Sequence, residues 1–193
     1  MTTRSSLIAH LQGYQTTYAD EHYFIRQFLA LLQHPDSFQR THLPGHVTGS
    51  AWVINEDRDR VLLTHHAKLN RWLQPGGHAD GDENIISVAS REALEETGLK
   101  SLRLFDENIF DIDVHLIPAH KEMSAHYHYD IRLLLEASSE EAFTVTEESH
   151  ALAWIHLDEI ETITEKNSSI LRMRDKTRDL RSETKTKVSL DNF

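Results

Sequence analysis

Three glutamates, Glu92, Glu95 and Glu96, stand close together in the sequence, shortly after a pair of glycines. On a helix with about 100° per residue, Glu96 lies roughly 40° around the axis from Glu92, and Glu95 lies roughly 60° to the other side. Side chains at these spacings come within about 5 to 6 Å of one another, so their like charges repel. A hard divalent cation such as Mg²⁺ or Mn²⁺ would relieve that repulsion, because it prefers carboxylate, water and phosphate oxygens. The plain alternative is a solvated acidic face on an exposed helix.

The residues around these glutamates predict a helix over 84–97 that lies between two groups of strands. Asp82 is a suitable N-cap for this helix, and Gly98 is the residue type expected just past a helix end. β-Branched and aromatic residues predict strands at 47–54, 61–66, 108–117, 126–137 and 151–157, with a short piece at 72–73. Apolar residues at helical spacing predict two short helices between residues 4 and 34 and two closing helices at 157–163 and 168–180.

The spacing of glycine, arginine and glutamate over residues 77–99 resembles the signature of the Nudix hydrolase family. The positions that carry the resemblance are Gly77, Glu83, Arg91, Glu92, Glu95, Glu96, Gly98 and Leu99. Seven of these positions, all except Leu99, are fixed to one residue type in the signature. At roughly 6% usage per residue type, the probability of a chance match at all seven is below about one in a million. Ala93 departs from the pattern, because the family prefers a bulkier aliphatic residue there. The flanking strands and Trp154 extend the resemblance to roughly residues 46–160.

The resemblance implies a fold and a reaction. The fold is α/β, a Nudix-type α/β/α sandwich in which a mixed β-sheet lies between helices. The reaction is hydrolysis of nucleoside diphosphates linked to another moiety, with Mg²⁺ (or Mn²⁺) as the cofactor. The metal ligands that carry over are Gly77 through its carbonyl, Glu92, Glu95 and Glu96.

The resemblance also implies roles for other residues near the motif. The general base is Glu95 or a glutamate from the later TEES segment, Glu147 or Glu148, and a histidine or the absence of a single base stays open as a third alternative. The catalytic candidates are Glu95, Glu96 and Glu148. Arg91 is placed to pair with Glu95 or Glu83 and so to hold the carboxylates. Arg91 and His78, which directly follows Gly77, are the candidate substrate-binding residues.

Fourteen histidines are the second unusual feature of the sequence. Strand alternation in the segment HYHYD puts His126 and His128 on one face and Tyr127 and Tyr129 on the other. Three interpretations stay open for these histidines: a second, softer metal site, a phosphate-binding rim, or hydrogen-bonded side chains without a ligand.

Composition limits the partners and the location. With 20 Lys plus Arg against 31 Asp plus Glu, the chain carries a formal net charge of −11. That charge opposes binding to polyanions, so we expect a small nucleotide-like diphosphate as partner and neither nucleic acid nor membrane. Absence of cysteine excludes disulfides and thiol nucleophiles. Since no signal-peptide core or apolar span is visible, the expected location is the cytoplasm.

The expected organisation has three parts. Residues 1–45 form an N-terminal helical extension and connector, residues 46–182 a Nudix hydrolase domain, and residues 183–193 a frayed C-terminal tail. The N-terminal helices could form a homodimer contact.

Three functions are compared on this basis. A divalent-metal-dependent pyrophosphohydrolase is the leading hypothesis. A non-catalytic, nucleotide-sensing module of the same fold is the second, and the intact glutamates argue against it. An isopentenyl diphosphate isomerase of the same fold is the third; it resembles enzymes that use a catalytic cysteine, and this chain has none.

Overall fold

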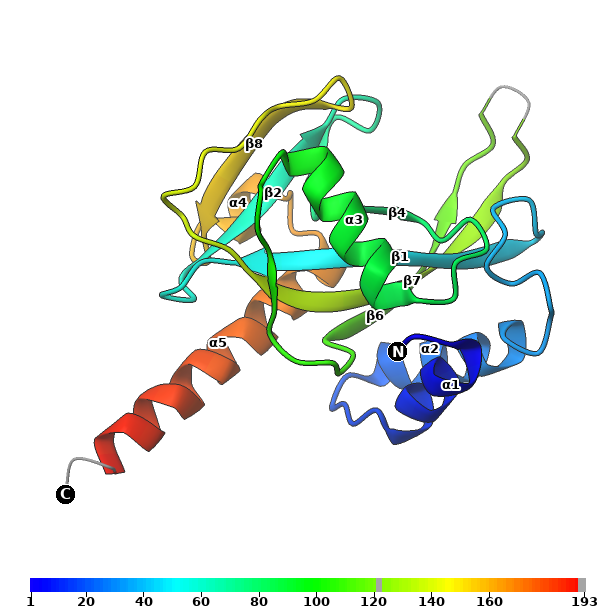
Figure 1. Cartoon of the computed structure of the whole chain (residues 1–193), viewed down its shortest axis with the longest axis horizontal. Helices are drawn as coiled ribbons and strands as arrows, with labels where there is room; N and C mark the ends of the chain where they lie inside the picture. The colour runs from blue at the N-terminus through cyan, green and yellow to red at the C-terminus, as the bar shows by residue number, and fades with distance from the viewer. Residues whose placement is uncertain (121–122, 191–193) are drawn as a thin grey trace.

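The computed structural model describes residues 1–120 and 123–190, with side chains as far as residue 182. Two helices precede the strands of one sheet, and a helix at Ile85–Thr97 crosses these strands (Figure 1). The last helix, Ser168–Leu190, packs on the sheet at its start and projects away from it toward its C-terminal end. Within the described ranges the elements, in chain order, are α1 (Arg4–Gly13), α2 (Ala19–Leu31), β1 (Gly45–Ile54), β2 (Arg60–His66), β3 (Arg71–Leu73), β4 (Gly76–His78), α3 (Ile85–Thr97), β5 (Arg103–Leu104), β6 (Asp111–Ile117), β7 (His126–Glu136), β8 (Ser149–His156), α4 (Ile160–Ile163) and α5 (Ser168–Leu190).

The strands form one mixed sheet. Its central path is β3-β2-β1-β7-β5, with β4 paired to β1, β6 paired to β7 and β8 paired to β2. Strands β1 and β7 run parallel along their length, and the other pairs are antiparallel. The mixed sheet is therefore confirmed. The short strands β4 and β5 were not expected, because two or three residues carry too little alternation to reveal a strand.

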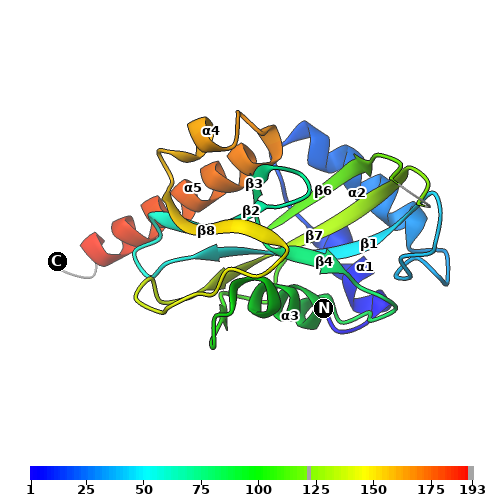
Figure 2. The same ribbon diagram turned by 90° about the horizontal axis from the view of Figure 1, so that it is seen from above.

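Helices cover both faces of this sheet. Seen from above, α3 lies on one side of the strands, and α4 and α5 lie on the other (Figure 2). Alternation along β1 serves both faces: Val53 joins the hydrophobic cluster that contains α3, while Trp52 and Ile54 join the cluster that contains α4 and α5. Ala93, the small residue in the motif, is fully buried in the first cluster. The expected sandwich is present, and the core accommodates alanine at that position.

The N-terminal helices contribute to the main core. Leu7 and Leu11 of α1 and Phe28 of α2 are almost completely buried. They belong to the same hydrophobic cluster as Val88 of α3 and Val47 of β1. The segment expected as an extension therefore packs its apolar face directly onto the sheet domain.

A buried ion cluster connects β6, β7 and α5. Arg132 of β7, whose side chain is 3% exposed, donates to Asp111 at 3.0 Å, to Asp113 at 3.2 Å and to Asp130 at 2.8 Å. Arg172 of α5 also binds Asp111, at 2.8 Å. Charges buried this deeply are stable only when each keeps its partners. The cluster therefore fixes α5 against the sheet.

Helix α3 is bounded by polar and glycine caps. The side chain of Asn84 accepts from the Ser87 amide at 3.2 Å, so Asn84 is the N-cap rather than Asp82, which was the wrong prediction. Asp82 instead accepts from the Asn84 amide at 2.8 Å and shapes the turn that enters the helix. Gly98 ends the helix in the left-handed region at φ 66°, as expected for a glycine just past a helix end.

Helix α5 extends further than the sequence indicated. It continues to Leu190, through most of the segment expected to be a frayed tail at 183–193, and residues 191–193 lie outside the described residues. The segment from 182 to 190 contains neither glycine nor proline, so no residue in it stops a helix. No helix in the described part of the chain combines the length and apolar character needed to cross a membrane.

Candidate active site

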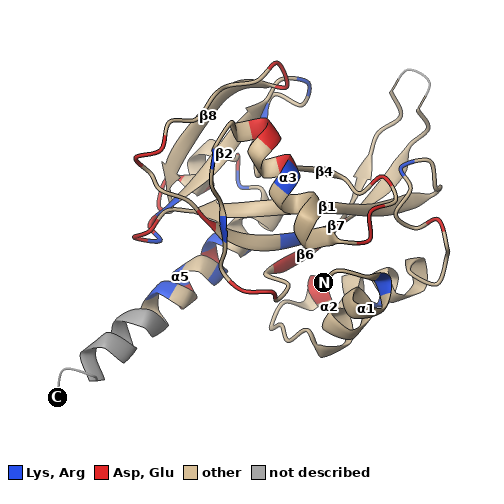
Figure 3. Ribbon diagram, viewed as in Figure 1, with Lys and Arg blue, Asp and Glu red and all other residues tan. Residues whose placement is uncertain are grey.

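Helix α3 presents its glutamates because its other face is anchored in the core. Ile85, Val88 and Ala89 are fully buried against the sheet. Figure 3 shows acidic positions toward the C-terminal end of α3, with a basic position beside them. The helix therefore holds its carboxylates at a fixed position above β1 and β4.

Glu96 is the most buried of the three glutamates. It is 9% exposed, and its Oε1 accepts a hydrogen bond from the Gly76 amide at 2.9 Å. Burial and, to a smaller extent, the negative charges of Glu148 and Glu92 together raise the pKa of Glu96 to about 7, against the lowering effect of the Gly76 hydrogen bond. Among the described residues no cation pairs with this carboxylate. Its negative charge is therefore held in a site that favours a positive partner.

Glu92 contacts the glycine pair directly. A Cβ on Gly77 would lie 2.4 Å from Oε2 of Glu92, and a Cβ on Gly76 would lie 2.2 Å from Oγ of Ser50. The Cβ on Gly76 would also meet Cα of Ser50 at 2.7 Å, so that position requires glycine, whereas a Cβ on Gly77 would displace the carboxylate of Glu92. Burial raises the pKa of the Glu92 carboxyl, and Arg91 partly offsets that effect. The motif thus places the backbone of the glycine loop against a half-buried carboxylate.

Arg91 holds the helix and the loop together. Its Nη1 donates to Glu92 Oε1 at 2.7 Å and to Glu95 Oε2 at 3.3 Å, which confirms the expected pairing with Glu95. Its Nη2 donates to the carbonyl of His78 at 3.3 Å. The side chain of Glu95 is 62% exposed, so this carboxylate lies at the solvent edge of the site.

Glu83 has a different partner from the one expected. The backbone amide of Arg4 donates to it at 2.8 Å and the Arg4 Nε at 3.1 Å, so the start of α1 is tied to the loop before α3. Sequence reasoning missed Arg4, because 79 residues separate the two partners. No local signal marks a pairing at that distance.

Glu148 of the TEES segment lies just before β8, and its carbonyl accepts from the Ala67 amide at 2.9 Å. Its negative charge contributes to the raised pKa values of both Glu92 and Glu96. Glu147 and Glu148 are both exposed. The choice between them as general base therefore stays a prediction.

The donor set suits a hard divalent cation. The carboxylate of Glu96 is buried and that of Glu92 is half-buried, and both lie beside the glycine loop. Burial and neighbouring negative charges raise the pKa values of both carboxyl groups, which favours a bound cation with oxygen ligands. In the described structure Arg91 holds Glu92 and Glu95, so the three carboxylates of α3 do not yet converge within 4.8 Å of one another. A bound cation would compete with Arg91 for these oxygens.

A family model described as the NUDIX domain matches residues 44–174, which is more than half of the chain. The chain belongs to the NUDIX domain family. The expected membership is therefore confirmed, and the match extends past residue 160, where the visible resemblance ended, into α5.

Named relatives of this Nudix chain cover only part of it. A "Probable DHNTP pyrophosphohydrolase" of Lactococcus lactis subsp. cremoris is 34% identical over 99 residues, which are 50% of this chain and 57% of the relative. An asymmetrical bis(5'-nucleosyl)-tetraphosphatase of Rattus norvegicus is 27% identical over 113 residues, which are 55% of this chain and 70% of the relative. The chain thus spans little more than half the length of the first of these relatives.

Solved structures agree on the fold. The structure of a C. elegans Ap4A hydrolase has a TM-score of 0.55 at 14% identity, and the match covers 71% of this chain and 98% of that chain. A NUDIX family hydrolase of Clostridium perfringens has a TM-score of 0.55 at 22% identity and covers 70% of this chain and 97% of its own. At these identities the similarity establishes the Nudix fold and nothing narrower.

A histidine cluster lies beside the Nudix motif. Ring centroids of neighbouring pairs lie between 4.9 and 5.6 Å apart. The expected alternation is confirmed, because His126 and His128 share one face, with their Nε2 atoms 3.3 Å apart. Burial lowers the pKa of His78 to about 4 and that of His128 to about 2, so both rings are neutral at pH 7. The members of the cluster are His46, His78, His115, His126 and His128.

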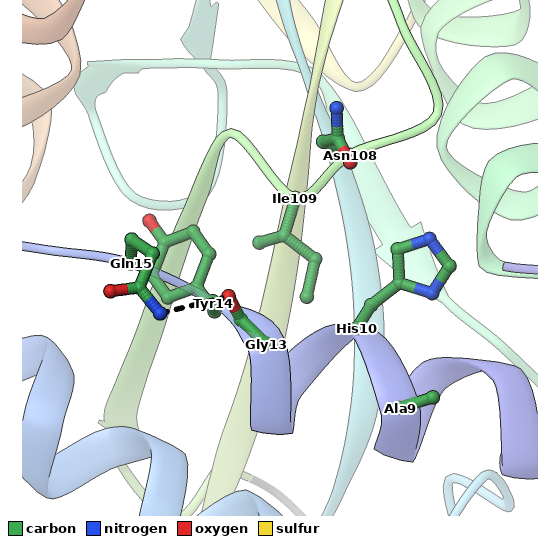
Figure 4. A pocket seen from close by; sticks show the side chains of 7 residues that line it. All are labelled: Ala9, His10, Gly13, Tyr14, Gln15, Asn108 and Ile109. Carbon is green, nitrogen blue, oxygen red and sulfur yellow. Dashed lines mark hydrogen bonds between the residues drawn. The ribbon is translucent and has the colours of Figure 1, made fainter.

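Two hollows of about 500 and 520 Å³ lie away from the glutamates. The first lies between the end of α1 and the segment before β6, where His10 and Ile109 face each other (Figure 4). The second adjoins it and reaches Lys176 of α5. No residue of α3 or of the glycine loop lines either hollow. The candidate active site therefore does not coincide with either of these cavities.

Proposed function

We propose that this chain is a divalent-metal-dependent hydrolase that cleaves the pyrophosphate bond of a nucleoside diphosphate linked to another moiety. The observation that carries the proposal is the buried carboxylate of Glu96, which faces Glu92 and Glu148 without a cation of the protein to neutralise it. Membership in the NUDIX family and the phosphoanhydride-cleaving activities in the names of two relatives support the same conclusion.

Mg²⁺ (or Mn²⁺) is the proposed cofactor. The residues that would hold it are Glu92 and Glu96, with the Gly77 carbonyl and Glu95 as further ligands. When bound, such an ion neutralises phosphate oxygens and lowers the pKa of a coordinated water. The chain needs this help because its own net charge is −11.

The protein side chains supply position and a proton acceptor. Arg91 acts as a positioning residue, because it binds two carboxylates of α3 and the carbonyl before the helix. We assign the general base to Glu148, since it stands just before β8, outside α3, and its negative charge raises the pKa values of both Glu92 and Glu96. Glu95 is the alternative base, but its contact with Arg91 reduces its availability as a proton acceptor.

The remaining assignments follow from charge and placement. The acidic balance favours a small nucleotide over long nucleic acid. Direct substrate contact by Arg91 or His78 stays a prediction, and the His78 ring points toward His46 and His128. A homodimer contact through α1 and α2 also stays a prediction. A chain without cysteine suits a reducing compartment, so we infer a cytoplasmic location.

The test is a screen of dinucleoside polyphosphates, nucleotide sugars, ADP-ribose and nucleoside triphosphates with Mg²⁺ and with Mn²⁺. Glu96→Gln should abolish metal-dependent release of phosphate products, while Glu140→Gln, on an exposed loop, should leave it unchanged. Glu148→Gln should lower kcat more than Glu95→Gln does. Equal turnover by the unaltered chain and Glu96→Gln would refute the proposal. Tight nucleotide binding without turnover would indicate a sensing module instead.

A further inference from the structure

Three imidazoles from three neighbouring strands converge next to the glycine loop. One ring nitrogen from each of His46, His78 and His128 lies within 4.8 Å of the others. We propose that these three histidines bind one borderline divalent transition-metal ion of the Zn²⁺ class, at a site separate from the glutamates of α3. The proposal does not depend on the hydrolase activity.

Unpaired ring nitrogens point to a missing ligand in this cluster. His46 is 1% exposed, yet its Nε2 has no hydrogen-bond partner in the structure. The Nε2 of His78 is buried and unpaired in the same way. Buried polar atoms are normally paired, and an exception calls for an unseen water or ion. A metal ion would accept the lone pairs of both nitrogens at once.

The strand register keeps the three ligands together. Strand β1 pairs in parallel with β7, which sets His46 directly opposite His128. On its other edge β1 pairs with β4, which sets Thr48 opposite His78. The ring centroid of His78 lies 5.2 Å from that of His46 and 4.9 Å from that of His128. Since each ligand stands on a hydrogen-bonded strand, small side-chain rotations are enough to bring the nitrogens onto one ion.

Surrounding groups orient the rings as in known metal sites. Nδ1 of His46 lies 3.4 Å from the His42 carbonyl, and Nδ1 of His126 lies 2.9 Å from the Ser124 carbonyl. A donor bond from Nδ1 leaves Nε2 with its lone pair, the tautomer that binds a metal. The Nε2 atoms of His126 and His128 lie 3.3 Å apart. Two ligands of a tetrahedral Zn²⁺ at about 2.0 to 2.1 Å are separated by about 3.3 Å, so His126 is the candidate for a fourth ligand, although it stands outside the group of three whose nitrogens converge within 4.8 Å.

The donor chemistry selects the class of ion. Imidazole nitrogens favour Zn²⁺, Cu²⁺, Ni²⁺ and Co²⁺, whereas Mg²⁺ and Ca²⁺ require oxygen ligands. The converging group contains no carboxylate. The ion bound here would therefore differ from the Mg²⁺ proposed on α3. Because His78 follows Gly77 on β4, it would also fix the strand that carries the glycine loop.

Calorimetric titration of the full chain without an affinity tag, stripped of metal by a chelator, tests the site. Excess Mg²⁺ occupies the carboxylates of α3, and Zn²⁺ is then added. We expect one Zn²⁺ per chain, with binding at least about 100-fold weaker in His78→Asn and in His128→Gln. His150→Gln, an exposed histidine on β8, is the matched control and should bind Zn²⁺ as the unaltered chain does. Binding should survive in the Glu92→Gln, Glu96→Gln double variant, which separates this site from the glutamates.

X-ray absorption at the zinc edge gives an answer even if the histidine variants fail to fold. The unaltered Zn²⁺-loaded chain should show at least three imidazole ligands at about 2.0 Å. Coordination dominated by carboxylate oxygens would overturn the proposal, as would absence of Zn²⁺ binding by the unaltered chain. Full-strength binding by folded His78→Asn and His128→Gln would overturn it too. A fourth imidazole that disappears in His126→Gln would identify that residue as the remaining ligand.

Discussion

Replacing Glu96 with glutamine is expected to stabilise the metal-free protein at pH 8. Burial and neighbouring negative charges raise the pKa of this carboxyl from 4.5 to about 7. Between those two pH values the folded chain binds a proton that the unfolded chain does not, so stability falls as pH rises through that window. A shift of about 2.5 units at about 1.36 kcal/mol each makes the ionised group destabilising by about 3 kcal/mol above pH 7.

Glu96→Gln removes the charge and keeps an oxygen that accepts from the Gly76 amide. Urea unfolding in EDTA should give a gain of about 3 kcal/mol at pH 8 that shrinks toward zero near pH 4.5. In thermal unfolding the gain at pH 8 corresponds to roughly 6 to 12 °C. The titrating histidines cancel in the difference between the two proteins. Added Mg²⁺ should raise the Tm of the unaltered chain and leave that of the variant unchanged.

Glu95→Gln is the matched control, because its carboxylate is 62% exposed and its removal should change stability little. A Glu96→Gln protein that is less stable at pH 8, or whose gain is the same at every pH, would refute the reasoning. Either result would mean that groups of the folded chain already compensate the negative charge of Glu96, so that no bound cation is needed to stabilise it.

Three further outcomes follow from contacts described above. Gly77→Ala should weaken Mg²⁺ binding, measured by calorimetric titration, by at least about 10-fold, because its Cβ would meet Glu92 at 2.4 Å. Gly13→Ala is the control, because its Cβ meets nothing within 4 Å, and it should leave the affinity for Mg²⁺ unchanged. Arg132→Met should cost about 3 to 5 kcal/mol of unfolding free energy in urea, since it leaves buried carboxylates without their cation, and a loss below about 1 kcal/mol would contradict this. Burial alone would raise the pKa of Asp113, but Arg132 lowers it well below its ordinary range. The ion pair therefore stabilises the folded chain above about pH 4, and this stabilisation should disappear as the pH falls further. Acid unfolding that begins at lower pH in Arg132→Met than in the unaltered chain would contradict this expectation.

Local spacing was enough to predict helix α3 and the glycine that ends it. Its glutamates, the glycine at its C-terminal end and the apolar residues of its buried face all lie within about four turns, so helical geometry alone relates them. The N-cap was assigned two residues too early, because Asp82 and Asn84 are both good capping residues and only the backbone conformation distinguishes them.

Long-range pairing could not be predicted in the same way. Alternation put His126 and His128 on one face, but the neighbours of that face depend on which strand lies beside β7, and in what register. No pattern in the sequence therefore indicated that His46 and His78 lie beside His126 and His128. The same holds for the contact between Arg4 and Glu83. Glu148 was named only through the resemblance, because its position depends on the path of the segment between β7 and β8.

The burial of α1 and α2 limits how this chain can be shortened. The family match begins at residue 44, yet Leu7, Leu11 and Phe28 fill the same core as α3. A truncation at that boundary would expose an apolar surface. It would also remove the hydrogen bonds from Arg4 to Glu83, which hold the loop that leads into α3. The first forty residues thus form part of the hydrophobic core of the folded chain, and a fragment that lacks them should aggregate.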